Sequence, residues 1–410
     1  MLIDKLGQFG LDQFDRWAGQ IRSYGELPLQ IRLWNGRDYR FSASPTVTIT
    51  LPGPQAVSYF RKPSLASLGE AYVEGQVDID GPLLSVFEVA VALAGRLVSG
   101  NKLWGRLAAR NAHHSRTLDS ESIQYHYDVS DEFYRLWLDE QMVYSCAYFE
   151  RGDETLADAQ VKKLDHILTK VMLRPGEQLL DIGCGWGALI LRAATQFGAH
   201  ATGITLSENQ YERARQRIRD AGVQDRCKVL LCDYRDVTGT YDKITSVGMF
   251  EHVGLANLAG YFAKVNSLLR DGGLVLNHGI TTTDVNNGSG AYFGGSDFID
   301  RYVFPNGELP HLALAVKEMS AAGLEVLDVE SLRRHYARTL ELWTDRFEAN
   351  GSRIRTMVDD KHYRIWRVYL AGCAWAFAND WVSIYQLLGC RAGTAGLNPT
   401  PMSRGYMYPK

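Results

Sequence analysis

The segment GMFEHVG, residues 248–254, places a carboxylate and an imidazole directly after an apolar run that is typical of a buried strand. A carboxylate at the end of such a strand needs a partner, because an unpaired buried charge is costly. Glu251 can serve there as a base, a metal ligand, a group that binds a ligand, or a structural hydrogen-bond acceptor. The segment alone leaves these four roles open.

A second chemical feature is LLDIGCGWGALI, residues 179–190, which is typical of a strand, a glycine-rich turn and the start of a helix. Gly183 and Gly185 let the backbone turn tightly and let a ligand approach. A nicotinamide dinucleotide site also expects an acid at the end of the next strand. That strand ends in GITLSENQ, residues 203–210, where Thr205, Ser207 and Gln210 replace the expected acid, so the dinucleotide alternative is weakened.

Metal binding is a further alternative for the polar residues near Glu251. His252, His278 and Asp233 could join it as ligands, but the two histidines lack the helical HxxxH or HExxH spacing of known zinc sites. None of the six cysteines forms a CxxC pair. The sequence therefore favours reduced thiols and predicts no metal.

Length and composition narrow the class of protein. The 410 residues suggest two domains, and 46% hydrophobic with 22% charged residues is typical of a globular protein. The net charge of −3 gives no general attraction to nucleic acid. The chain start has acids where a secretory leader has basic residues, and no apolar run approaches the roughly 20 residues of a spanning helix. We therefore expect a cytoplasmic protein.

Alternating elements from about residue 155 must position these side chains. Strands are predicted at 178–183, 200–206, 227–233, 242–250 and 274–280, and helices at 157–173, 188–198, 209–222 and 257–273. Alternation with apolar strands predicts the α/β class, with a doubly wound, Rossmann-like parallel sheet. Ligands of such sheets bind at the carboxyl ends of the strands.

The N-terminal part of the chain has a different sequence pattern. Residues 1–95 predict a small α+β domain of short strands and a helix at 83–95, and we expect this domain to help engage lipid. Residues 96–120 are expected to form a basic linker before a catalytic domain at 121–410. Between 96 and 118 there are five Lys and Arg and no acid. This stretch is either a solvated linker or an element that meets anionic lipid headgroups.

Several motifs resemble known families. DIGCGWG resembles the first motif of the S-adenosylmethionine-dependent methyltransferases. Together with IQYHYDVSDEFYRLWLD, MVYSCAYFE, SVGMFEHVG and YVFPNGELP, it resembles the cyclopropane-fatty-acyl-phospholipid synthase family and its mycolic-acid relatives over nearly the whole chain. The resemblance implies transfer of a methyl group from S-adenosylmethionine to a cis double bond of a phospholipid acyl chain, with ring closure and bound bicarbonate as base.

The resemblance also implies site residues. The bicarbonate would be held by the backbone around Cys146, the side chains of Glu251, His278 and Tyr336, and the backbone of Ile280. Cys373 matches a cysteine assigned as catalytic in some members, although LAGCAWAF by itself is typical of a buried helix. The implied cofactor-binding residues are Tyr144, Ser145, Asp181, Gly183, Cys184, Gly185, Gly187, Thr205, Leu206, Ser207, Gln210, Asp233, Tyr234 and Arg235.

The implied reaction predicts roles for further residues. Attack by a double bond leaves a carbocation, which aromatic faces stabilise; the candidates are Tyr144, Tyr148, Phe149 and Tyr336. A bound anion as base avoids alkylation of a protein carboxylate, and Glu251 would share a proton with it. The long insertion at 281–310 is expected to cover the acyl channel.

Partners and alternatives follow from the same resemblance. We expect a peripheral protein at the inner face of the membrane, where the phospholipid bilayer presents unsaturated acyl chains. We expect no nucleic acid partner. A homodimer is one expected assembly. A relative that yields a methyl-branched or hydroxylated lipid, or a lipid-binding homologue without activity, remains an alternative.

Overall fold

The computed structural model describes residues 2–60, 64–98, 130–285, 298, 302, 308–393 and 398–408. Most of the predicted basic linker and most of the predicted channel insertion therefore lie outside the described residues. The chain forms two compact units. The described residues of the first are 2–60, 64–98, Phe298, Tyr302 and 347–376, and the second contains the rest.

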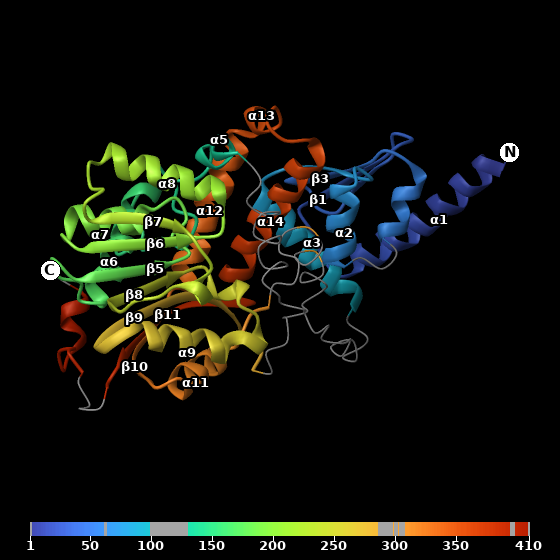
Figure 1. Cartoon of the computed structure of the whole chain (residues 1–410). Coiled ribbons are helices and arrows are strands. Elements are labelled where there is room, and N and C mark those ends of the chain that lie inside the picture. The colour runs from blue at the N-terminus through green and yellow to red at the C-terminus, as the bar shows by residue number, and fades with distance from the viewer. Residues whose placement is uncertain are drawn as a thin grey trace. The chain divides into compact units, whose positions relative to one another are not determined.

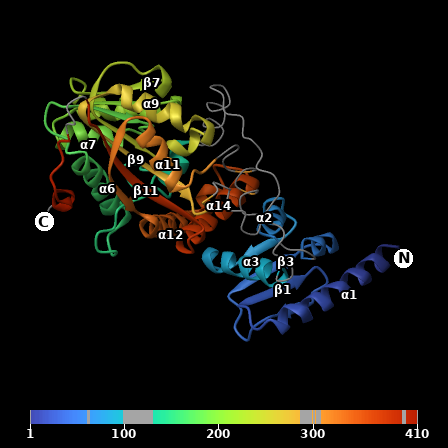
Figure 2. The same cartoon turned by 90° about the horizontal axis from the view of Figure 1, so that it is seen from below.

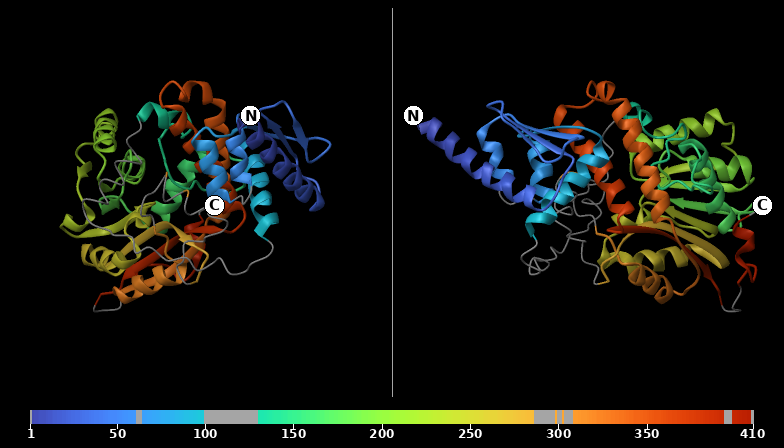
Figure 3. Two further views of the ribbon diagram at one scale, coloured as in Figure 1. Left: turned by 90° about the vertical axis from the view of Figure 1, so that its right-hand side faces the viewer. Right: turned by 180° about the vertical axis from the view of Figure 1, so that it is seen from behind.

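The first unit is a small sheet with helices. Its elements are α1 (Leu2–Ser23), β1 (Leu29–Leu33), β2 (Asp38–Arg40), β3 (Val47–Leu51), α2 (Leu65–Val73), β4 (Asp78–Asp80), α3 (Leu83–Val98), α13 (Gly351–Ile354) and most of α14 (Asp360–Ala378). The strand order is β2-β1-β3-β4, with β1 and β3 parallel. Leu29, Ile31 and Leu33 of β1 are buried in one apolar cluster with Phe14 and Trp17 of α1. Figure 3 shows this first helix, in dark blue, running beside the strands of the small sheet.

Helix α14 packs within this first unit, whereas chain order had placed it in the domain at 121–410. Arg364 Nη1 donates to the carbonyls of Tyr72 and Val77 at 3.0 and 3.1 Å. Arg367 Nη1 donates to the Tyr72 hydroxyl at 2.8 Å. These contacts join segments nearly 300 residues apart, a pairing that no local pattern reveals.

The second unit is built on a seven-stranded sheet (Figure 1). Its strands are β5 (Gln178–Ile182), β6 (His200–Thr205), β7 (Cys227–Leu231), β8 (Tyr241–Val247), β9 (Leu269–Thr282), β10 (Leu324–Ser331) and β11 (Val382–Arg391). The order is β10-β11-β9-β8-β5-β6-β7, and the five strands from β9 to β7 are parallel. The predicted doubly wound fold is confirmed, while β11, antiparallel to both of its neighbours, was not predicted.

Helices cover both faces of this sheet. The helices of the second unit are α5 (Asp131–Arg135), α6 (Leu156–Lys170), α7 (Ala188–Gln196), α8 (Glu208–Asp220), α9 (Leu258–Leu268), α11 (Leu312–Ala321) and α12 (Arg333–Ala349), whose last residues belong to the first unit. One apolar cluster joins α6, α7 and α8 to the sheet, and another joins α9 and α11 to its other face (Figure 2). No helix in the described ranges combines the length and apolar character needed to cross a membrane.

One boundary differs from the prediction. The helix expected at 257–273 ends at Leu268, and β9 begins at Leu269 instead of residue 274. Tyr241 pairs with Leu269, and a register shift follows before Lys243 pairs with Leu274. Gly272 takes a φ of +72° within this irregular stretch, so Asp-Gly-Gly marks a distortion of the strand and not the end of the helix.

Candidate active site

The glycine-rich turn after β5 is held against the neighbouring strand β6. Gly183, Gly185 and Gly187 have φ values of +81°, +53° and +82°, which residues with a Cβ rarely adopt. The amides of Gly183 and Cys184 donate to the Ile204 carbonyl at 3.0 and 2.9 Å. The turn therefore places an open backbone surface at the carboxyl end of β5, where α7 begins.

A cavity lies over this turn, and we call it the cofactor cavity. It is lined by every residue predicted to bind the cofactor except Gly187 and Ser207. Those two residues begin α7 and α8, and the Ser207 hydroxyl accepts from the Gln210 amide at 3.3 Å. Lining residues that were not predicted to bind the cofactor include Lys163, Met249 and His252. Trp186, which lies within the glycine-rich motif, also lines the cavity.

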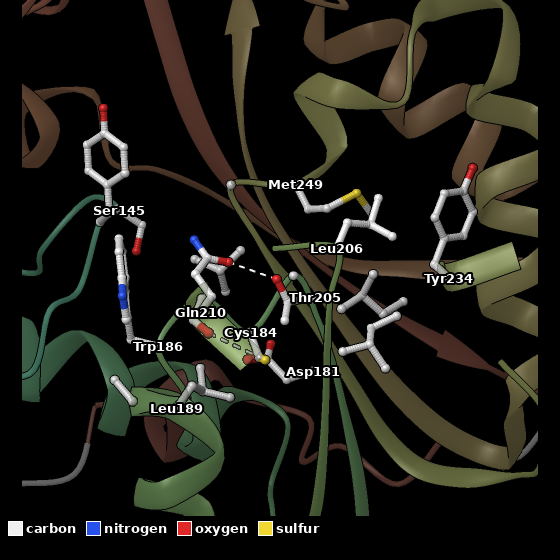
Figure 4. Close-up of a pocket in the computed structure, with 18 of the residues that line it drawn as sticks. Ser145, Asp181, Cys184, Trp186, Leu189, Thr205, Leu206, Gln210, Tyr234 and Met249 are labelled. Atoms are coloured by element: carbon white, nitrogen blue, oxygen red, sulfur yellow. Dashed lines mark hydrogen bonds between the residues drawn. The ribbon is translucent and has the colours of Figure 1, made fainter. Parts of the chain in front are cut away.

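Polar side chains of the cofactor cavity pair with one another. Thr205 Oγ1 lies 2.8 Å from Gln210 Oε1, and Asp181 Oδ1 accepts from Thr245 Oγ1 at 2.7 Å. Burial raises the pKa of Asp181 to about 6. Figure 4 shows Ser145 and Trp186 on one side of the cavity and Tyr234 on the other.

The far side of the cavity offers a flat aromatic surface beside an ion pair. Asp233 Oδ2 accepts from Arg235 Nη2 at 2.6 Å, and Asp233 Oδ1 accepts from the Arg235 amide at 2.9 Å. The Arg235 guanidinium lies 5.4 Å from the centre of the Tyr234 ring, which also meets Tyr261 edge-on at 5.4 Å. This fixed ring can stack on a planar ligand group.

Glu251 lies in a short 3-10 turn, η3 (Phe250–His252), at the carboxyl end of β8. Its Oε1 accepts from the Ile280 amide of β9 at 2.6 Å. Its buried Oε2 has no hydrogen-bond partner among the described residues. Burial raises the pKa of Glu251 to about 7, against the opposing effect of the Ile280 amide. A Cβ at Gly279 would overlap the Phe250 ring, so the turn packs directly on β9.

His278 lies on β9, two residues before Ile280, whose amide meets Glu251; for short we call Glu251 and His278 the Glu251–His278 pair. His278 is completely buried, and Gln386 of β11 pairs with it in register. Gln386 Nε2 lies 3.2 Å from His278 Nδ1, while His278 Nε2 has no partner among the described residues. Burial lowers the pKa of His278 well below its usual value, so the ring is neutral at pH 7. The sequence analysis missed Gln386 because β11 was not predicted.

Cys146 and Tyr336 lie beside a common segment at the start of α12. Cys146 Sγ is 3.8 Å from the carbonyl of Leu332, and the Tyr336 amide donates to the same carbonyl at 2.9 Å. Burial raises the pKa of the Cys146 thiol far above its usual range, so it stays protonated.

The predicted cation-stabilising aromatic residues fall into two groups. Trp343 joins Tyr144 and Tyr336, with ring centres 5.4 and 6.0 Å away. Tyr148 instead stacks between His166 and His335 at 4.3 and 4.9 Å. The ring of Phe149 also lies near His335, at 6.5 Å. The structure thus connects Tyr144, which lines the cofactor cavity, with Tyr336, and it places the other two in a separate stack.

Cys373 lies on α14 in the first unit. Burial is the one cause that raises its pKa, to about 12, and no neighbouring charge opposes it. A reactive cysteine needs a lowered pKa, so the environment is that of an inert thiol. Among the described residues, no three of His, Cys, Asp and Glu gather where they could hold a metal ion.

Comparison with known proteins places the chain in a family. Residues 114–387 match the family described as mycolic acid cyclopropane synthetase, and residues 17–102 match a domain of unknown function. A probable fatty acid methyltransferase of Pseudomonas putida is 45% identical over 384 residues, covering 93% of this chain and 96% of the relative. Cyclopropane mycolic acid synthase 1 of Mycobacterium tuberculosis is 37% identical over 272 residues, covering 65% of this chain and 95% of the relative.

Solved structures agree with the sequence match. A crystal structure of a mycolic acid cyclopropane synthase complexed with SAH and CTAB superposes with a TM-score of 0.63 at 36% identity, covering 66% of this chain and 98% of that one. The fold of the second unit is therefore that of the S-adenosylmethionine-dependent methyltransferases. Since the family match spans more than half of the sequence, the chain belongs to the mycolic acid cyclopropane synthetase family.

Proposed function

We propose that the chain transfers the methyl group of S-adenosylmethionine to the cis double bond of an unsaturated acyl chain in a membrane phospholipid, and that loss of a proton then closes a cyclopropane ring. Family membership and the methyltransferase fold support the coarser part of this proposal. The observation that carries the finer part is the Glu251–His278 pair, in which two buried polar atoms lack partners among the described residues.

The cofactor cavity fits S-adenosylmethionine, which when bound supplies an electrophilic methyl group. Gly183 and Gly185 leave the backbone open to a ligand. Thr205 and Gln210 offer hydroxyl and amide groups at the end of β6, where ribose binds in such folds. Tyr234 presents the flat face that an adenine ring would stack on.

Aromatic side chains stabilise the substrate cation in this proposal. When the double bond attacks the methyl group, positive charge develops on the neighbouring acyl carbon. Tyr144, Trp343 and Tyr336 form a continuous aromatic wall that starts in the cofactor cavity. Such faces attract a cation, and the attraction strengthens where water is excluded.

The Glu251–His278 pair would hold the base. A pKa of about 7 lets Glu251 keep its proton and donate Oε2–H to an anion that a carboxylate would repel. With the Gln386 amide nitrogen facing Nδ1, the proton of neutral His278 lies on Nε2, which offers a second donor. Two donors in a buried site suit a small planar anion such as bicarbonate, which would accept the proton released from the transferred methyl.

The substrate and location are part of the same proposal. Unsaturated acyl chains of phospholipids are presented by a bilayer, so the protein would act at the inner face of the membrane. The nature of the substrate is tested by incubating the protein with methyl-labelled S-adenosylmethionine and vesicles of unsaturated or fully saturated phospholipid. Label in the unsaturated lipid alone, as a ring product by mass spectrometry, supports the proposal. Label in neither lipid would overturn it.

A methyl-branched product is the second candidate. The relative that covers 93% of this chain is named a fatty acid methyltransferase, whereas the cyclopropane synthase named above matches 65% of it. This product forms when the cation loses a proton from an acyl carbon, which leaves a branched alkene of the same mass as the ring product. Mild hydrogenation before mass spectrometry separates the two, because the alkene gains two hydrogens and the ring does not.

A further inference from the structure

The segment between α5 and α6 carries part of the site but has no regular structure of its own. Residues 136–155, all of which the structure describes, form no helix or strand. Within them, Tyr144 and Ser145 line the cofactor cavity, and Cys146 follows directly. A segment without a regular hydrogen-bond ladder keeps one conformation only through contacts with its neighbours. We call residues 143–149 the site segment.

Helices α6 and α12 supply the hydrogen-bond partners of the site segment. Three consecutive amides, those of Ala147, Tyr148 and Phe149, donate to Thr339 Oγ1, the Ala159 carbonyl and His335 Nδ1, each at 3.0 Å. Burial lowers the pKa of His335, so its ring is neutral at pH 7 and Nδ1 can accept. The site segment therefore depends on the positions of these two helices.

The Tyr148 ring lies between two imidazole rings, one from each helix. His166 of α6 stacks on it with ring centres 4.3 Å apart and planes 20° apart. His335 of α12 stacks on it at 4.9 Å and 8°. Stacked rings attract each other beyond the effect of burial alone. The three rings therefore join the site segment to both helices.

The outer end of this stack is held by Glu330 of β10 and by Tyr408. His166 Nε2 lies 2.8 Å from Glu330 Oε2, and the Tyr408 hydroxyl donates to Glu330 Oε1 at 3.2 Å. The Tyr408 ring centre is 5.6 Å from that of His166. Burial opposes the ionisation of Glu330, but His166 and Lys170 lower its pKa to about 2, so the carboxylate is charged at pH 7 and accepts these bonds.

The residues just before Tyr408 pack on α6 and β10. They form the 3-10 turn η5 (Arg404–Met407), which contacts α6 (Figure 2). Three contacts anchor this turn: Met407 is buried in the apolar cluster that includes α6, the Tyr406 hydroxyl donates to the Lys170 carbonyl at 3.3 Å, and Arg404 Nε lies 2.9 Å from Asp328 Oδ1. A change at Tyr408 alone therefore leaves the turn anchored.

We propose that residues 398–408 form a clasp that fixes the site segment through the stacked rings of His166, Tyr148 and His335. Tyr408 and Tyr148 are positioning residues in this arrangement, because neither lines the cofactor cavity. The family match ends at residue 387, so the clasp lies outside the matched residues. Its effect on ligand binding rests on the proposed function, whereas its effect on the conformation of the site segment does not.

Amide hydrogen exchange of the full chain, followed by mass spectrometry, tests the clasp without any ligand. Tyr408→Ala should speed the exchange of the site segment by about fivefold, because losing a hydrogen bond and a ring contact makes local opening easier. Tyr408→Phe keeps the ring and should give a smaller increase. Unchanged exchange in Tyr408→Ala would overturn the inference. An equal increase in β5 and β6 would also overturn it, because that result is a general loss of stability.

Tyr24→Ala is the matched control, because the Tyr24 side chain belongs to the first unit and is exposed to the same extent as Tyr408, at 46% against 48%. It should leave the exchange of the site segment unchanged. If Tyr24→Ala speeds that exchange as much as Tyr408→Ala does, the effect is not specific to the clasp and the inference is wrong.

A second measurement addresses the middle of the stack. Tyr148→Leu removes the stacked ring and should lower the affinity for S-adenosylhomocysteine, measured by calorimetry, by about fivefold. Tyr148→Phe keeps the ring and should stay within about twofold of the wild type. Equal losses in both variants, or no loss in either, would contradict the role of the stack. Failure of the wild-type protein to bind S-adenosylhomocysteine would contradict the proposed function instead, and the exchange measurement would still decide whether the clasp fixes the site segment.

Discussion

The cofactor cavity and the Glu251–His278 pair both lie at the carboxyl ends of the parallel strands, but they satisfy their polar groups differently. In the cavity, Thr205 meets Gln210 and Asp233 meets Arg235. In the pair, Glu251 Oε2 and His278 Nε2 are buried and have no partner among the described residues. A buried polar atom without a partner costs free energy. In the proposed function, these two atoms are the ones that would meet the bound anion.

The largest expected effect comes from removing the ionisable group of the pair. Glu251→Gln keeps the shape but cannot share a proton with an anion, so turnover should fall by at least about 100-fold. The affinity for S-adenosylhomocysteine, measured by calorimetry, should change by less than about twofold. Thr205→Val, in the cofactor cavity, should instead lower the affinity for S-adenosylhomocysteine more than it lowers turnover. If Glu251→Gln kept full activity, the Glu251–His278 pair would have no separate part in turnover, and the prediction would be wrong.

The second prediction concerns stability and pH. The pKa of Glu251 is raised from 4.5 in the unfolded chain to about 7 in the folded one. Its contribution is fully present below about pH 4.5 and is lost as the pH rises through about 7. Relative to Glu251→Gln, the wild-type free energy of unfolding should therefore fall by about 3 kcal/mol between pH 4.5 and 8.

Urea unfolding of both proteins in bicarbonate-free buffer measures this difference. If the two stabilities keep a constant offset over the whole range, Glu251 is not a buried neutral acid, and the contrast with the cofactor cavity weakens.

A smaller effect is expected at Gln386, which orients His278. Gln386→Met has a similar shape but leaves Nδ1 without its amide partner. We expect turnover to fall about tenfold, the effect of one hydrogen bond, with little change in S-adenosylhomocysteine affinity. Steady-state kinetics measure the turnover, and calorimetry measures the affinity for S-adenosylhomocysteine. A loss confined to ligand affinity would assign Gln386 to the cofactor cavity instead.

The smallest effect is expected at Cys373. Cys373→Ser should keep turnover within about twofold, because a thiol with a pKa of about 12 is not a nucleophile at neutral pH. Burial of the hydroxyl should lower the unfolding free energy by about 1 kcal/mol. A large loss of turnover in a stable variant would restore the catalytic role that the family resemblance implies.

The cofactor cavity was easier to predict than the Glu251–His278 pair, for physical reasons. The glycine turn and the end of β6 are encoded by short contiguous motifs, so local spacing was enough. The register that brings Gln386 to His278 depends on β11, which arrives from more than 100 residues away. Lys163 did leave a signal, because its spacing places it on the apolar side of α6 with Leu164 and Ile167.

The most direct test of the central claim is the rate of labelled methyl transfer into unsaturated phospholipid vesicles as bicarbonate is added to carbon-dioxide-free buffer. If the Glu251–His278 pair holds the base as an anion, the wild-type rate rises with bicarbonate and saturates, while Glu251→Gln stays low at every concentration. A wild-type rate that is equally high without bicarbonate would contradict the account.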